Sequence, residues 1–111
     1  MVQRTQGELL QGTLSLLILR VLASQSNHGF GIAKRIQTIS GDVLRVEEGS
    51  LYPALHRMEI DGWLRSDWGQ TENKRKAKYY RLTARGRRQL EREIQRWNSI
   101  AGAMTTILKE A

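Results

Sequence analysis

The last quarter of the chain carries a long amphipathic pattern, which constrains the fold more than any other feature of the sequence. Apolar or small residues recur there at alternating spacings of four and three, the pattern of a coiled-coil seam, and Ile100 and Ile107 widen it. A helix over residues 84–110 would be about 40 Å long, longer than the body of a domain of this size. Its far half therefore needs another partner, and a second copy of the chain is the simplest one. The predicted dimerisation residues are Leu90, Ile94, Trp97, Ala101, Met104 and Leu108.

Two shorter helices are predicted near the start of the chain. Apolar residues with helical spacing favour a first helix over about residues 13–24. Ser26 or Asn27 can cap a second helix, His28 helps to start it, and Gly41 would stop it. The predicted inward-facing positions of the two helices are Leu14, Leu17, Ile18, Val21, Leu22, Ile32, Ala33, Ile36 and Ile39.

A short strand and a third helix are predicted in the middle of the chain. Residues 42–48 are β-branched and partly alternating, which favours a strand. Ser50 is a natural N-cap for the helix, and Pro53 then falls in the first turn, where its missing N–H has no intrahelical acceptor to lose. The helix should end near Gly62. Its predicted inward positions are Leu51, Leu55 and Met58.

A β hairpin is predicted between the third helix and the last one. Residues 63–68 and 78–82 are aromatic, branched or alternating, and the polar, basic residues 69–77 between them would form a charged tip. Thr83 is the predicted cap of the last helix, in which Gly86 is an early weak point. The residues that share one strand face, and so can cover the core, are Leu64, Ser66 and Trp68, and Tyr80 and Leu82.

Positive charge is concentrated in one part of the chain. From Lys74 to Arg96 there are ten basic and two acidic residues, so this segment carries +8, while the whole chain carries +7 and the remainder −1. Such a concentration of charge attracts polyanions, nucleic acid before anionic membrane. The alternative for a charge run taken by itself is a solvated surface.

The order of the predicted elements is that of a winged helix-turn-helix, a mainly α fold with a small β hairpin. We expect a single structural domain, in which residues 1–83 bind DNA and residues 84–111 form a C-terminal dimerisation helix. The third helix of such a domain can enter the major groove of double-stranded DNA while the hairpin tip reaches the neighbouring backbone. The predicted DNA-binding residues are Ser50, Tyr52, Pro53, His56 and Arg57 of the helix, and Lys74, Arg75, Lys76 and Lys78 of the hairpin.

Three ordered motifs then give the chain a family resemblance. They are HGFGI at residues 28–32, EGSLYPALHRME at residues 48–59, and KYYRLT at residues 78–83 followed by Gly86. With these motifs at compatible spacing, the chain resembles the PadR family of bacterial transcriptional regulators. The resemblance implies a homodimeric repressor that binds inverted-repeat operator DNA and is often released by a small-molecule effector. The residues that it places at the DNA surface are Ser50, Tyr52 and Pro53.

Alternatives remain for single residues and for the whole chain. Tyr52 can cover a helix start, Pro53 can serve helix initiation, and Arg57 can pair with Glu59. A winged-helix adaptor that binds another protein through its long helix is one alternative to a sequence-specific regulator, and non-specific nucleoid binding is another. A cavity at the dimer seam near Trp97 could accept a flat apolar effector.

Composition argues against several other classes of protein. With no Cys and two His, the chain has no disulfide framework and no zinc site, and no catalytic triad or phosphate-binding glycine loop stands out. We therefore expect no enzyme activity, no metal and no cofactor. The apolar runs are far shorter than the roughly 20 residues of a membrane span, and residues 1–12 are too polar for a signal peptide. A cytoplasmic location is expected.

Overall fold

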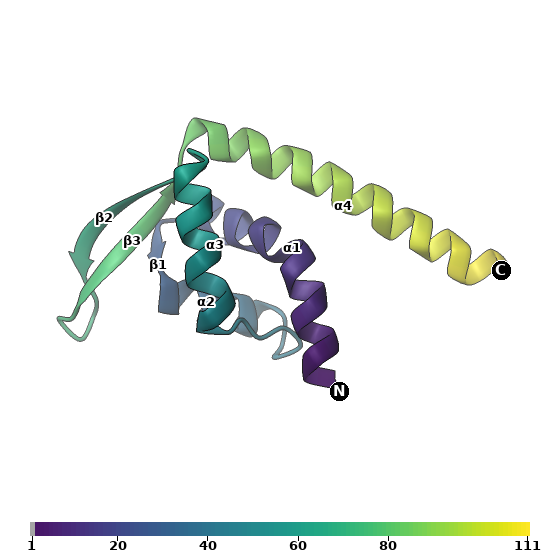
Figure 1. Cartoon of the computed structure of the whole chain (residues 1–111), viewed down its shortest axis with the longest axis horizontal. Helices are drawn as coiled ribbons and strands as arrows, with labels where there is room; N and C mark the ends of the chain where they lie inside the picture. The colour runs from purple at the N-terminus through teal and green to yellow at the C-terminus, as the bar shows by residue number, and fades with distance from the viewer. Residues whose placement is uncertain (1) are drawn as a thin grey trace.

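The computed structural model describes the backbone of residues 2–111 and the side chains of residues 13–111. Figure 1 shows a body built from three helices, a hairpin that projects from one side, and a long helix that extends beyond the body. The predicted mainly α winged helix-turn-helix with a long C-terminal helix is confirmed. The elements within the described range are α1 (Val2–Ser24), β1 (Asn27–His28), α2 (Gly29–Ile39), α3 (Glu48–Ile60), β2 (Leu64–Gln70), β3 (Lys76–Leu82) and α4 (Ala84–Glu110).

One hydrophobic core joins α1, α2, α3, the sheet and the first turns of α4, and its burial is the main force that holds the body together. The predicted inward positions of α3 are all buried. Ile39, by contrast, is exposed, because it is the last residue of α2 and lies past the edge of the core. The core residues are Leu14, Ile18, Leu19, Leu22, Ile32, Ile36, Leu51, Ala54, Leu55, Met58, Leu64, Tyr80, Leu82 and Leu90.

The first two helices begin at other residues than predicted. α1 begins at Val2 rather than near residue 13, because a helical backbone can continue beyond the apolar stripe from which its start was predicted. α2 is capped by His28, whose Nδ1 accepts a hydrogen bond from the Gly31 amide at 3.1 Å, and not by Ser26 or Asn27. The prediction that His28 helps to start α2 is confirmed.

α3 also begins earlier than predicted. Its N-cap is Glu47, which makes no side-chain capping bond, and Ser50 lies inside the first turn. Pro53 therefore falls in the second turn rather than the first, where its missing N–H leaves the carbonyl of Gly49 without its usual helical donor. The predicted end near Gly62 is confirmed, since Gly62 follows the C-cap with a φ of 80°.

The segment before α3 is a loop, so the strand predicted over residues 42–48 is wrong. Gly41 and Asp42 have φ values of 62° and 67°, which turn the chain sharply after α2. Leu44 and Val46 then pack against the core from the loop. Their alternation with polar residues therefore reflects the packing of a loop and not the pleat of a strand.

The hairpin belongs to a three-stranded antiparallel sheet with the strand order β1-β3-β2, because the two residues of β1 pair with β3. β2 and β3 are longer than predicted, so the tip spans residues 71–75 instead of 69–77. Tyr80 and Leu82 face the core, as predicted. Trp68 lies farther along the same sheet face and is exposed, because the hairpin projects beyond the body.

The start of α4 is fixed by two contacts with the turn after α3. The predicted cap is confirmed: the Thr83 hydroxyl accepts a hydrogen bond from the Gly86 amide at 3.0 Å and donates one to the Gly62 carbonyl at 2.6 Å. A Cβ atom on Gly86 would lie 2.2 Å from the backbone oxygen of Trp63. Gly86 is therefore a point of close packing rather than the weak point that we predicted.

Candidate nucleic-acid interface

One face of α3 is buried and the opposite face is open to solvent. Leu51, Ala54, Leu55 and Met58 fix the rotation of the helix, since all four are almost completely buried. The five side chains predicted to contact DNA therefore lie together on the exposed face. They are Ser50, Tyr52, Pro53, His56 and Arg57.

Tyr52 has a structural role as well as an exposed surface. Its ring packs on the start of α2, where a Cβ on Gly29 would lie 2.7 Å from the ring carbon Cε1 and from the hydroxyl oxygen. The side chain is nevertheless 44% exposed. Tyr52 thus covers a helix start and still presents part of its ring on the open face of α3.

Glu59 joins α3 to both strands of the hairpin. Ser66 Oγ on β2 donates a hydrogen bond to Glu59 Oε2 at 2.6 Å, and Lys78 Nζ on β3 lies 3.5 Å from Glu59 Oε1. The hydrogen bond from Ser66, with a smaller contribution from the charge of Lys78, holds the pKa of Glu59 below its ordinary value. We call these three side chains the Glu59 clip. The clip fixes the hairpin relative to the exposed face of α3.

The clip was not predicted from the sequence. Arg57, the partner considered for Glu59, lies outside it, and Lys78, predicted to contact DNA, lies within it. Lys78 is half-buried and its charge is already paired, which makes it a poorer contact for phosphate than a free lysine. No local pattern in the sequence links Glu59 with Ser66 or Lys78, so nothing there signalled this contact.

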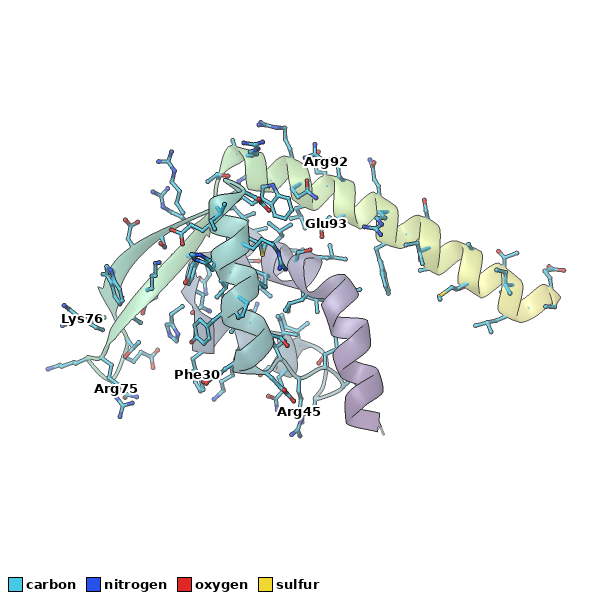
Figure 2. All side chains as sticks on the ribbon, in the orientation of Figure 1. Phe30, Arg45, Arg75, Lys76, Arg92 and Glu93 are labelled. Atoms are coloured by element: carbon cyan, nitrogen blue, oxygen red, sulfur yellow. The ribbon has the colours of Figure 1, made fainter. Side chains whose placement is uncertain are left out.

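The hairpin tip carries the remaining predicted DNA contacts. Lys74, Arg75 and Lys76 are exposed, and Figure 2 shows Arg75 and Lys76 at the end of the hairpin that lies farthest from the body. Lys74 adopts a φ of 60° in the turn, where its amide donates to the Thr71 carbonyl at 2.9 Å. Neither ion pair found among residues 13–111 includes a tip residue. The tip and the adjoining first residue of β3 therefore present three free cationic groups to solvent: Lys74, Arg75 and Lys76.

α4 carries the predicted dimerisation residues, and these divide into two groups. Leu90 is buried in the core of its own chain. Ile94 and Trp97 are partly exposed, at 37% and 46%, and Ala101 is partly buried, whereas Met104 and Leu108 farther along are well exposed. The apolar face of α4 beyond Leu90 thus lies largely uncovered in the single chain.

No group of three or more His, Cys, Asp or Glu residues in the described part of the chain could hold a metal ion. The described helices also include none with the length and apolar character needed to cross a bilayer.

Comparisons with known proteins agree with this arrangement. Residues 18–92 match the family model described as the transcriptional regulator PadR-like family. The chain is 33% identical over 94 residues to the transcriptional regulator Rv3488 of Mycobacterium tuberculosis, covering 85% of this chain and 84% of that protein. A PadR family transcriptional regulator from Eggerthella lenta superposes with a TM-score of 0.81 at 29% identity, over 99% of this chain and 94% of that one. A transcriptional regulator from Clostridium thermocellum gives a TM-score of 0.83 at 25% identity, over 92% and 99%.

Proposed function

This chain belongs to the PadR-like family of transcriptional regulators, and from that premise we propose that it is a cytoplasmic repressor that binds an inverted-repeat operator as a homodimer. In this proposal residues 1–83 bind the DNA and residues 84–111 hold the two subunits together. No catalytic step, metal or cofactor has a part in it.

The observation that carries the proposal is the Glu59 clip, which holds an open polar helix face and a cationic hairpin in one rigid unit. An α-helix with its side chains is about 10–12 Å across, and the major groove is about 12 Å wide. The exposed face of α3 can therefore enter the groove. The tip would then contact phosphates on the neighbouring backbone, through Lys74, Arg75 and Lys76.

The uncovered apolar face of α4 supports the dimer. A two-fold axis through this face would bury Trp97, Met104 and Leu108 of each copy against the other. Such an axis would also relate two copies of α3, which calls for half-sites about 34 Å apart, one helical turn of DNA. A pseudo-palindromic operator follows from this symmetry.

The same face supports release by a small effector. Trp97 is a large aromatic side chain, 46% exposed, on a face otherwise built of aliphatic and small residues. A flat apolar molecule that stacks between the two copies of Trp97 would change the distance between the copies of α3. Trp fluorescence and operator affinity should then change together as the effector is added.

Selection of binding sites from random duplex DNA by the full chain is the decisive experiment. We expect pseudo-palindromic sites, and we expect the affinity to fall steeply with salt. Lys76→Gln should lower the slope of log K against log salt by about one unit without changing the preferred sequence. The matched control is Lys109→Gln at the far end of α4, which should leave the slope unchanged. Recovery of asymmetric sites alone would contradict the proposal, and no duplex binding at low salt would favour the adaptor.

A further inference from the structure

Five exposed arginines form a second cationic surface, remote from the hairpin tip. They come from β2, β3 and α4. Figure 2 shows Arg92 pointing away from the body on α4, whereas Arg75 and Lys76 stand at the far end of the hairpin. Together we call them the back arginine surface: Arg65, Arg81, Arg85, Arg88 and Arg92.

Strand register and helix geometry bring these arginines together. Arg65 and Arg81 are directly opposed across β2 and β3. Arg85, Arg88 and Arg92 follow one another at spacings of three and four, so they share one face of α4. A groove of about 640 Å³ is lined by Arg65, Arg81 and Arg85, and a second of about 560 Å³ by Arg85 and Arg92. Because Arg85 lines both grooves, the surface is continuous from the hairpin base along the start of α4.

The back arginine surface remains open when α4 is covered by a second copy. Arg92 and Glu93 are consecutive residues, about 100° apart around α4. Glu93 lies on the side that meets α1, where its carboxylate accepts a hydrogen bond from Ser15 Oγ at 2.8 Å, whereas Arg92 points away from the body (Figure 2). At 3.6 residues per turn, Arg85 and Arg92 also face away from Trp97. Dimerisation through the apolar face would therefore leave these arginines exposed.

Folding gains little from this arrangement of charge. Like charges directly opposite each other on paired strands are destabilising, as in the Arg65–Arg81 pair. The first turn of α4 has no acidic residue, although the helix macrodipole favours acids and disfavours cations there. Within the described residues, the only ion pair that includes an arginine of the back arginine surface joins Arg81 to Asp67 at 3.6 Å. An anion from outside the chain would relieve all of these repulsions.

The chemistry of the surface favours a nucleic-acid backbone over a protein. Protein interfaces have apolar centres, whereas interfaces with DNA are polar and strongly positive. Ile60 is the only well-exposed large apolar side chain among the described residues that line the two grooves. The acids there are few: Asp67 is paired with Arg81, Glu59 is held in its clip, and Asp61 lines the second groove. Guanidinium groups can also bind phosphate oxygens in a bidentate manner.

We propose that the back arginine surface binds the phosphate backbone of a second DNA duplex, so that one dimer bridges two segments of DNA. The seven residues of β3 span about 20 Å between the hairpin tip and the base, where this surface begins. In Figure 1 the hairpin and α4 run in different directions from this base, so we assign the back arginine surface to a second duplex and not to the one held by α3 and the tip. The bridging role rests on the proposed function, but binding of duplex to the back arginine surface does not.

Two variants of the full chain separate the two surfaces. The back variant carries Arg85→Gln, Arg88→Gln and Arg92→Gln, and the tip variant carries Lys74→Gln, Arg75→Gln and Lys76→Gln. The control removes three exposed charges elsewhere, through Arg20→Gln, Arg87→Gln and Lys109→Gln. Circular dichroism and sedimentation first establish that each variant is folded and has the wild-type subunit number. Each protein is then mixed with an immobilised random-sequence duplex and a labelled free one, and the captured label is counted.

The wild type and the control should capture the free duplex, and the back variant should capture at least tenfold less. The back variant should keep its affinity for a selected operator within threefold, while the tip variant loses that affinity and still binds random duplex. The back substitutions should lower the salt slope of that residual binding by about three units. Equal capture by the back variant and the control would overturn the proposal, as would binding of poly-glutamate but not of duplex. Failure of site selection alone would overturn the operator proposal and leave the back arginine surface in place.

Discussion

The two halves of α4 share one apolar repeat but differ in what covers it. In the near half, Gly86 and Leu90 are buried against the body of the same chain. In the far half, Met104 and Leu108 are 61% and 85% exposed. A helical repeat therefore reports that one face is apolar, but it does not report whether the same chain or another one covers that face.

Contacts that are closed within one chain differ from contacts that need a second chain. Closed contacts contribute to the free energy of unfolding of the single subunit at every protein concentration. Contacts between subunits contribute by mass action, so the stabilisation that they give increases with the protein concentration. Substitutions in the two halves of α4 should differ in this respect above all.

Leu90→Ala should have the largest effect. It removes a buried side chain from the core, which lowers the free energy of unfolding by about 3 kcal/mol. Urea denaturation at two protein concentrations tenfold apart should give the same loss. Leu108→Ala is the control from the far half, and its smaller effect should change with concentration. If the loss of unfolding free energy in Leu90→Ala grew with protein concentration, this residue would also contact the second subunit.

Gly86→Ala and Gly102→Ala form a matched pair on the same helix. The added methyl group at Gly86 would meet the Trp63 carbonyl, so the first turn of α4 must shift, at a cost of about 2 kcal/mol. Nothing lies within 4 Å of a Cβ built on Gly102, where alanine should stabilise the helix by about 0.5–1 kcal/mol. Thermal unfolding should therefore move in opposite directions for the two variants. Destabilisation by Gly102→Ala would show that a second chain packs closely there.

Trp97→Ala tests the far half directly. Removal of this partly exposed ring should raise the dissociation constant of the dimer at least tenfold, which is about 1.4 kcal/mol. Sedimentation across a dilution series measures it. Phe30→Ala is a suitable control, because it removes an exposed ring from α2 and should leave the dissociation constant unchanged. An unchanged constant for Trp97→Ala would place the subunit contact elsewhere.

The parts of the fold that were predicted correctly depend on local chemistry. Thr83 caps α4 by bonding to an amide three residues away, and Leu51, Leu55 and Met58 follow the period of their own helix. Such features are encoded within a few neighbouring residues. The helix bounds of α4 and the exposed face of α3 followed from the same kind of pattern.

The parts that were predicted wrongly depend on distant segments. The loop at residues 42–47 alternates because Leu44 and Val46 meet the core, and Gly86 is needed because the Trp63 carbonyl approaches it. The Glu59 clip is of the same kind, since it forms only once α3 and both strands have been placed. No spacing within the sequence brings its three side chains together.

The Glu59 clip is a polar contact that, like the near half of α4, is closed within one chain. Its removal should cause the smallest change in the free energy of unfolding among these variants. Glu59→Gln removes the charge that Lys78 pairs with, and we expect a loss of about 1 kcal/mol at pH 7 that does not depend on protein concentration. Because the folded pKa of Glu59 is lowered from 4.5, the native carboxylate stabilises the fold above that value. This stabilisation is lost as the pH falls through the folded pKa. The difference in unfolding free energy between wild type and variant, measured in urea from pH 7 downward, should therefore shrink in acid.

Asp67→Asn is the control for Glu59→Gln. It removes an exposed ion pair of similar length, so it should change stability by less than Glu59→Gln. A wild-type advantage that persists at low pH would mean that Glu59 acts through its shape and not through its charge.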